Sequence, residues 1–211
     1  MITPLIGALN DFASIAPELA TAALEFELPY ALVVAQCLQE SSWKLSGYRY
    51  EPSYDRRLIS STKSGPTWAL DPAWIKSGPT AADWFLYNKS RSKEQTPDKD
   101  WSFVAQTRIA ASWGGMQLMY PTAVGLGYKG PPEDLLKPQS VRLGVKLLAG
   151  LIAGAKKKGF KNDDAVAIGL AQYNGGNALG RNSDPKNLAN IEYVRTIGAR
   201  YRKCWGKELF T

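Results

Sequence analysis

The sequence predicts a mainly helical globular protein. Apolar residues recur at helical spacing in several segments, whereas the alternation of apolar and polar residues that indicates strands is scarce. Apolar residues make up 45% of the chain, and no apolar run reaches the length of a membrane span, so we expect a folded protein without stable membrane insertion. A chain of 211 residues suffices for one good core but is short for two equal domains. We therefore expect residues 1–211 to form a single domain.

The N-terminal half carries two predicted helices. The first covers residues 14–27, with Pro17 near its start, where the missing N–H of proline costs little. The second follows Pro29 and ends at Glu40. Residues 49–52 should then be extended or turning, because a residue that precedes proline avoids the helical conformation.

The C-terminal half carries the remaining helices. A long helical pattern over residues 133–157 contains Pro138, which can divide it. Another helix runs through residues 165–171, with Asp163 or Asp164 as a possible cap, and stops at Asn174-Gly175-Gly176. A final helix runs from about Leu188 to Trp205.

Residues 55–107 are the least regular part of the chain. Turn-forming pairs that contain proline punctuate this stretch, which we interpret as an aromatic-rich insertion or small lobe within the domain. Trp68, Trp74, Trp84 and Trp101 lie within it. Their rings could form the core of that lobe or stack on sugar rings.

The chain carries a formal net charge of +7, which favours an anionic partner. Nucleic acid, a membrane surface and an acidic bacterial envelope polymer all fit that charge. The basic residues are scattered, apart from groups at residues 156–161 and 200–203, and no nucleic-acid-binding signature accompanies them. We therefore expect no nucleic acid partner.

The residue types also restrict the chemistry. The sequence has no histidine and only two cysteines, so it predicts no zinc site of the usual kind and no Ser-His-Asp or Cys-His catalysis. We expect no metal and no cofactor. Acid–base chemistry must then use carboxylates, tyrosines, lysines or cysteines.

Glu40 is the leading chemical candidate. It ends an apolar helical segment whose apolar residues form two stripes, so that helix should be buried on more than one side. Desolvation should raise the pKa of a carboxyl group in this position and suit it to proton donation near neutral pH. The alternative is a buried structural acid that is held in an ion pair.

Three separated motifs occur in order along the chain. They are Gln39-Glu40-Ser41-Ser42, Gly114-Gly115-Met116-Gln117-Leu118-Met119 with Thr122-Ala123, and Gln172-Tyr173-Asn174-Gly175-Gly176, followed by Glu192-Tyr193-Val194. Together they resemble the lytic transglycosylases of glycoside hydrolase family 23, a lysozyme-like group that cleaves peptidoglycan. The resemblance covers residues 29–60 and 108–205. In two departures, Gly115 stands where the family often has leucine, and Pro121 lies one place later than the family's usual proline.

The resemblance implies a role for each matching residue. Glu40 would be the general acid and then the general base. Tyr173 would orient Glu40, Asn174 would hold the local turn or the substrate, and Tyr193 would close the site from the last helix. The remaining matches would line the cleft and bind sugar and acetamido groups; they are Ser41, Met116 and Gln117. Packing or backbone bonding is the alternative role for Ser41, Met116, Tyr173 and Asn174.

The reaction implied by the resemblance leaves 1,6-anhydromuramic products and needs one carboxylate, because the attacking hydroxyl belongs to the substrate. Glu51 and Asp55 are the nearest acids that could serve a two-carboxylate hydrolase, a muramidase, instead. Glu51 could equally be a structural carboxylate that is bound to Arg49. A non-catalytic peptidoglycan-binding or phage structural protein is a further alternative.

The expected partner is the peptidoglycan glycan strand, and the protein is expected to act as a monomer. Residues 49–52 with Tyr54 resemble a segment of bacteriophage members of the family. The N-terminus lacks the pattern of an ordinary secretory signal. These features suggest a phage or prophage lysin that is made in the host cytoplasm and acts on the cell wall in the periplasm, or that is carried by the virion.

Overall fold

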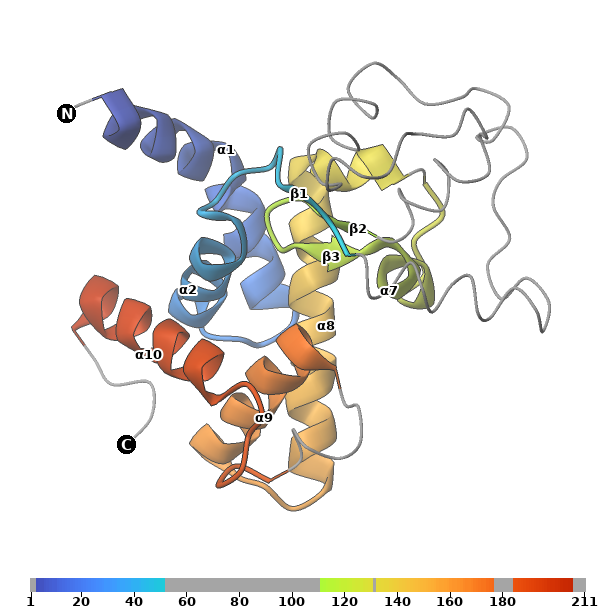
Figure 1. Ribbon diagram of the computed structural model, residues 1–211, viewed down its shortest axis with the longest axis vertical. Coiled ribbons are helices and arrows are strands. Elements are labelled where there is room, and N and C mark those ends of the chain that lie inside the picture. Colours follow the sequence, from blue (N-terminus) through green and yellow to red (C-terminus); the bar gives the residue numbers. More distant parts are fainter. Residues whose placement is uncertain (1–2, 52–110, 131, 177–183, 207–211) are drawn as a thin grey trace, which may run out of the picture.

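The computed structural model describes residues 3–51, 111–130, 132–176 and 184–206. Helices dominate this part of the chain, which confirms the mainly helical class. The long helix α8 (Val141–Lys157) runs through the middle of the molecule, with α1 (Thr3–Glu25) and α2 (Tyr30–Ser41) beside it (Figure 1). A small sheet and α7 (Tyr120–Gly125) lie toward the start of α8, and α9 (Asn162–Gly175) and α10 (Ile191–Trp205) complete the helices. The expected insertion at residues 55–107 lies outside the described residues.

The first helix is longer than predicted. It begins at Thr3 rather than near residue 14, so Pro17 lies inside it and not near its start. A proline inside a helix removes a backbone hydrogen bond and costs about 3 kcal/mol. Ile15 and Leu19 are completely buried on either side of this proline, and burial of such side chains contributes about 1.5–3 kcal/mol each. Tertiary packing therefore outweighs the local penalty that made residue 14 look like the start.

Helix α2 matches its prediction closely. It begins directly after Pro29, and six consecutive residues from Leu32 to Cys37 are buried. It ends where Ser42 adopts the left-handed conformation, with φ of 56°, and donates its N–H to the Leu38 carbonyl at 3.0 Å. Glu40 consequently occupies the last turn of a helix that is otherwise deep in the protein.

The boundaries of the later helices were partly predicted. Two short 3-10 helices (Pro132–Leu136 and Pro138–Ser140) precede α8, so the pattern is divided at Pro138 as expected. The prediction that an aspartate caps α9 is wrong: Lys161 occupies the cap position, and Asp163 and Asp164 lie in the first turn of the helix. Their charges instead complement the positive end of the helix dipole.

The last two helix boundaries follow from turn chemistry. Helix α9 stops as predicted, because Gly176 takes φ of 65° and donates its N–H to the Gln172 carbonyl at 2.8 Å. Helix α10 begins at Ile191, slightly later than the predicted start at Leu188. Leu188 is buried in the turn that precedes the helix, so its apolar character reflects core packing.

A three-stranded antiparallel sheet lies beside the helices. Its strands β1 (Tyr48–Tyr50), β2 (Ala111–Trp113) and β3 (Leu118–Met119) are ordered β1-β2-β3. The first strand confirms the extended conformation expected around residue 49. The sheet as a whole was not predicted, because strands of two or three residues are too short to show alternation.

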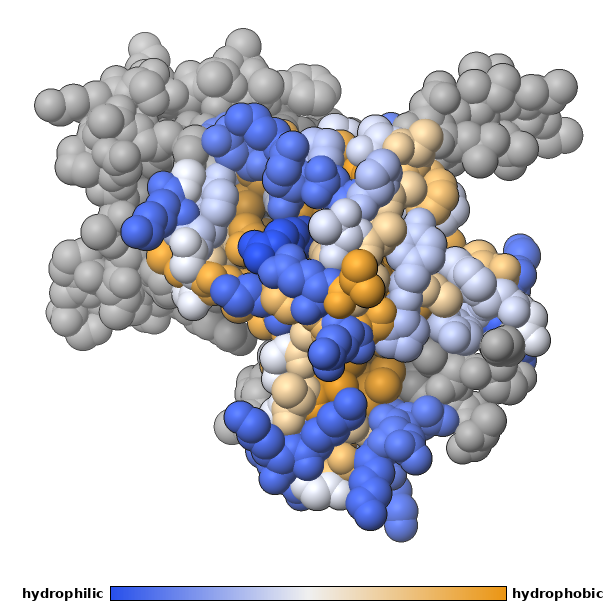
Figure 2. Space-filling view, turned by 180° about the vertical axis from the view of Figure 1, so that it is seen from behind, coloured by the Kyte–Doolittle hydropathy of each residue, from blue (hydrophilic) through white to orange (hydrophobic). Residues whose placement is uncertain are grey.

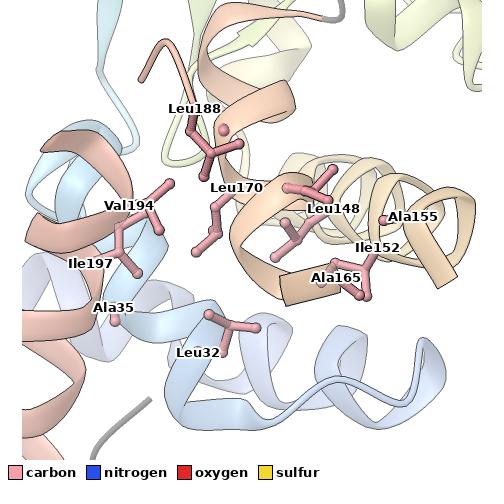
Figure 3. Packing of buried hydrophobic residues seen from close by; sticks show 12 residues of the cluster. Leu32, Ala35, Leu148, Ile152, Ala155, Ala165, Leu170, Leu188, Val194 and Ile197 are labelled. Atoms are coloured by element: carbon pink, nitrogen blue, oxygen red, sulfur yellow. The ribbon is translucent and has the colours of Figure 1, made fainter. Parts of the chain in front are cut away.

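The largest core cluster joins α2, α8, α9 and α10. Figure 3 shows Leu32 and Ala35 of α2 facing Val194 and Ile197 of α10, with residues of α8 and α9 completing the cluster. Gly169 of α9 permits the close approach to α8, because an added Cβ there would lie 2.5 Å from Cγ1 of Ile152. This packing fixes α10 against the helix that carries Glu40.

The described surface is largely polar. No helix in this part of the chain is long and apolar enough to cross a membrane. Seen from behind, hydrophilic side chains gather at the lower end of the molecule, where α8 finishes, and hydrophobic residues appear nearer the middle (Figure 2). Lys156, Lys157 and Lys158 are exposed at that end.

Candidate active site

Glu40 lies at the edge of the protein's core, partly buried in the last turn of α2. The pKa of its carboxyl group is raised to about 7, chiefly by burial, and the charge of Glu51 makes a smaller contribution in the same direction. A hydrogen bond from Tyr193 and the positive charge of Arg49 act in the opposite direction. Because burial dominates, the group holds its proton over much of the range in which an ordinary glutamate has lost it.

Tyr193 makes the direct contact with this carboxyl group. Its hydroxyl donates a hydrogen bond to Oε1 of Glu40 across the interface between α10 and α2. Burial raises the pKa of Tyr193 well above its ordinary value, as does the nearby Glu40 charge, so the hydroxyl keeps its proton and acts as a donor. Tyr193 thus holds one oxygen of Glu40 in a fixed position.

Tyr173 has a different partner from the one expected. Its hydroxyl donates to the backbone carbonyl of Met116 at 2.7 Å, so it does not orient Glu40 by a direct hydrogen bond. Its phenol ring belongs to α9, packs at the core and lines the cleft beside Glu40. The contact ties α9 to the loop that joins β2 and β3.

That loop, residues 114–117, is held against α2 and α8. Gly114 takes φ of 72°, and an added Cβ would lie 2.1 Å from the Leu135 carbonyl oxygen. The next carbonyl, of Gly115, accepts hydrogen bonds from the Ser41 hydroxyl at 2.8 Å and from the Cys37 thiol at 3.3 Å. Burial raises the pKa of Cys37 to about 12, which keeps the thiol protonated as a donor. Gly114 and Gly115 therefore allow the loop to approach these elements closely.

A polar network covers the sheet side of the site. Gln117 adopts φ of 46°, accepts a hydrogen bond from Ser112 at 3.0 Å and donates to the Gly114 carbonyl at 2.9 Å. Glu51 forms an ion pair with Arg49, with 2.6 Å between Oε1 of Glu51 and Nε of Arg49. This ion pair is the structural role that the sequence offered as the alternative to a second catalytic carboxylate. Both acids face the same cleft, since the Glu51 charge acts on Glu40.

These residues surround a cleft of about 420 Å³. Sheet, α7, α8 and α9 all contribute to its walls. The described lining residues are Glu40, Arg49, Glu51, Ser112, Gln117, Met119, Thr122, Leu147, Leu151, Gln172, Tyr173, Asn174, Gly175 and Gly176. The lining combines polar residues, including both acids, with the apolar side chains of Leu147 and Leu151 of α8. A lining of this kind can bind a molecule that has both polar and apolar groups.

The predicted site residues divide into two groups. The first group lines the cleft and consists of Glu40, Glu51, Gln117, Tyr173 and Asn174.

The other three support the lining residues from behind. Ser41 bonds the loop backbone, Met116 is buried in a core cluster, and Tyr193 holds Glu40. For Ser41 and Met116 these contacts are the structural roles that the sequence left open as alternatives.

Sequence reasoning missed several residues of the site. Ser112 precedes the glycine motif and gave no signal of its own, since serine in a short strand is uninformative. Asn190 donates to the side-chain carbonyl of Asn174 at 3.1 Å and to the Ala171 carbonyl at 3.3 Å. If the predicted start of α10 had been Ile191, Asn190 would have been its cap residue and a candidate for the site. Within the described ranges, no group of three potential metal ligands occurs.

The chain matches no protein-family model, no curated protein and no solved structure. The resemblance to family 23 therefore depends on the sequence motifs alone.

Proposed function

We propose that this protein is a peptidoglycan lytic transglycosylase with a lysozyme-like fold, which cleaves the β-1,4 bond between N-acetylmuramic acid and N-acetylglucosamine. The observation that carries the proposal is Glu40, a carboxyl group with a pKa raised to about 7 that faces a cleft and is held by a tyrosine. Carboxyl groups with raised pKa in clefts are typical of general acids. The order of the sequence motifs supports the choice of substrate.

In the first half-reaction, protonated Glu40 donates its proton to the glycosidic oxygen as the bond from that oxygen to C1 of the muramic acid breaks. The resulting carboxylate accepts the hydrogen bond of Tyr193, which stabilises the new negative charge. In the second half-reaction Glu40 removes the proton of the muramic acid C6 hydroxyl, and O6 bonds to C1. This proton restores the protonated form of Glu40, and the product carries a 1,6-anhydro ring.

The main alternative is hydrolysis by a muramidase that uses Glu51 as its second carboxylate. One observation favours it: Glu51 lines the same cleft and its charge acts on Glu40. Against it stands the ion pair with Arg49 at 2.6 Å, which gives Glu51 a structural partner. The transglycosylase needs no such second carboxylate, so it is the better supported reaction.

The charge of the protein fits a wall substrate. A formal net charge of +7 attracts the chain to anionic wall material, and that attraction should weaken as salt rises. The resemblance of residues 49–52 and Tyr54 to phage members supports a role in phage-mediated wall degradation.

Mass spectrometry of the soluble muropeptides released from purified peptidoglycan tests this proposal. Wild type should release products with 1,6-anhydromuramic ends, and Glu40→Gln should lower the rate by about 10²- to 10⁴-fold. Glu51→Gln should leave the product type unchanged and alter the rate by less than about tenfold, because an exposed ion pair contributes about 1 kcal/mol at most. If wild type released products with reducing muramic ends, and Glu51→Gln did not, the protein would be a hydrolase. If the protein bound peptidoglycan and released no products, it would be a non-catalytic wall-binding protein.

A further inference from the structure

Gln36 is a buried amide that the proposed reaction does not use. Its side chain is 0% exposed, and neither its amide nitrogen nor its amide oxygen has a hydrogen-bond partner among the described residues. Buried polar groups are nearly always bonded, because an unpaired one costs free energy. An unpaired glutamine amide in the centre of a core helix therefore calls for a function.

The position of Gln36 points to that function. It lies one helical turn before Glu40 on α2, so the two side chains share one face of the helix. That face is packed against α10, which carries Tyr193. Gln36 also acts on Tyr193: it lowers the pKa of Tyr193 against the larger opposing effects of burial and of Glu40. A donor beside the hydroxyl oxygen has this effect.

We propose that Gln36 is a positioning residue for the acid: its amide N–H donates to the Tyr193 hydroxyl oxygen and so directs the O–H of Tyr193 onto Glu40. A hydroxyl that accepts a hydrogen bond becomes a stronger donor, because bonds in a chain polarise one another. Gln36 thereby strengthens the hydrogen bond to the Glu40 carboxylate and lowers the pKa of Glu40.

Gln36→Met tests the proposal, because methionine nearly keeps the volume and removes both polar atoms. The pKa of Glu40 can be followed by NMR of ¹³C-labelled glutamate carboxyl groups, which needs no enzymatic activity. We expect the Glu40 pKa to rise by about 0.2–0.5 unit, because the variant loses only the part of the Tyr193–Glu40 hydrogen-bond strength that comes from cooperativity. The melting temperature of the variant should stay close to that of wild type, because the loss of the bond to Tyr193 is offset by no longer burying the amide oxygen without a partner.

A double-variant cycle separates positioning from packing. Tyr193→Phe alone should raise the Glu40 pKa by about 1–2 units, and adding Gln36→Met should then produce no further change, since the amide acts only through the Tyr193 hydroxyl. Gln39→Met makes the same chemical change at a position that lies about 100° around the helix from Glu40, and it should leave the Glu40 pKa in place.

Three results would overturn the inference. They are an unchanged or lowered Glu40 pKa in Gln36→Met, an equal shift in the Tyr193→Phe background, and an equal shift in Gln39→Met. The consequence for catalysis rests on the proposed function, but the pKa measurement does not. Failure of the cycle and absence of glycan cleavage are therefore separate outcomes.

Discussion

Replacing Glu40 with glutamine should stabilise the protein, and by an amount that depends on pH. Burial raises the Glu40 pKa from 4.5 to about 7, so the folded state resists ionisation of this group. Glutamine has the shape of the protonated carboxyl group and no charge to desolvate. The substitution should therefore remove a free-energy cost that wild type carries only when Glu40 is ionised.

The sign and size follow from linkage. Between pH 4.5 and about 7 the folded state binds more protons at Glu40 than the unfolded state does, so wild-type stability falls as pH rises through that window. A gap of about 2.5 units at about 1.36 kcal/mol per unit corresponds to about 3 kcal/mol. Glu40→Gln should thus match wild type near pH 4 and exceed it by about 3 kcal/mol near pH 8.

Thermal and urea unfolding at several pH values measure this difference. For a domain of this size the predicted gain near pH 8 corresponds to about 6–12 °C in Tm. Glu192→Gln is the matched control, because Glu192 is 80% exposed in an ion pair on α10 and its replacement should change stability by less than about 0.5 kcal/mol at either pH. If Glu40→Gln were no more stable than wild type near pH 8, desolvation of Glu40 would be refuted.

Two further substitutions test how the site is built. Gly144→Ala should cost about 1–3 kcal/mol, because its Cβ would lie 2.5 Å from Cβ of Met116 and 2.9 Å from the Tyr173 hydroxyl, whereas Gly150→Ala on the same helix meets nothing and should gain about 0.5–1 kcal/mol. Equal effects of the two in urea unfolding would contradict the close packing. Tyr173→Phe should cost about 1–3 kcal/mol by leaving the Met116 carbonyl unpaired. A carboxyl titration should show an unchanged Glu40 pKa in that variant, and a large shift would restore the role in orienting Glu40 that the sequence suggested.

The sequence predicted the helical class and the position of Glu40 because both depend on local patterns. The apolar run after Pro29 and the turn at Ser42 are consecutive in the chain, and so is the glycine stop of α9. The start of α1 was missed, because only the packing of Ile15 and Leu19 makes an internal Pro17 tolerable. Long-range contacts leave no such local signature.

In the candidate site, too, local patterns were predictable and long-range contacts were not. Motif order located the residues that surround Glu40, but it could not assign their partners. Tyr173 and Tyr193 are both tyrosines at helix positions of the motif, and only the three-dimensional packing decides which hydroxyl reaches Glu40. Gln36 gave no signal, because an amide on a mostly apolar stripe becomes notable only when its burial and its missing partner are seen together.

The pH dependence of kcat/KM for the release of anhydromuropeptides by the wild-type protein tests the proposed role of Glu40 most directly. A general acid works only while protonated, so kcat/KM should fall about tenfold per pH unit above the Glu40 pKa of about 7. That midpoint should coincide with the one found by carboxyl titration of Glu40. A rate that stays constant to about pH 9, or that falls at a pH unrelated to the Glu40 titration, would contradict Glu40 as the proton donor.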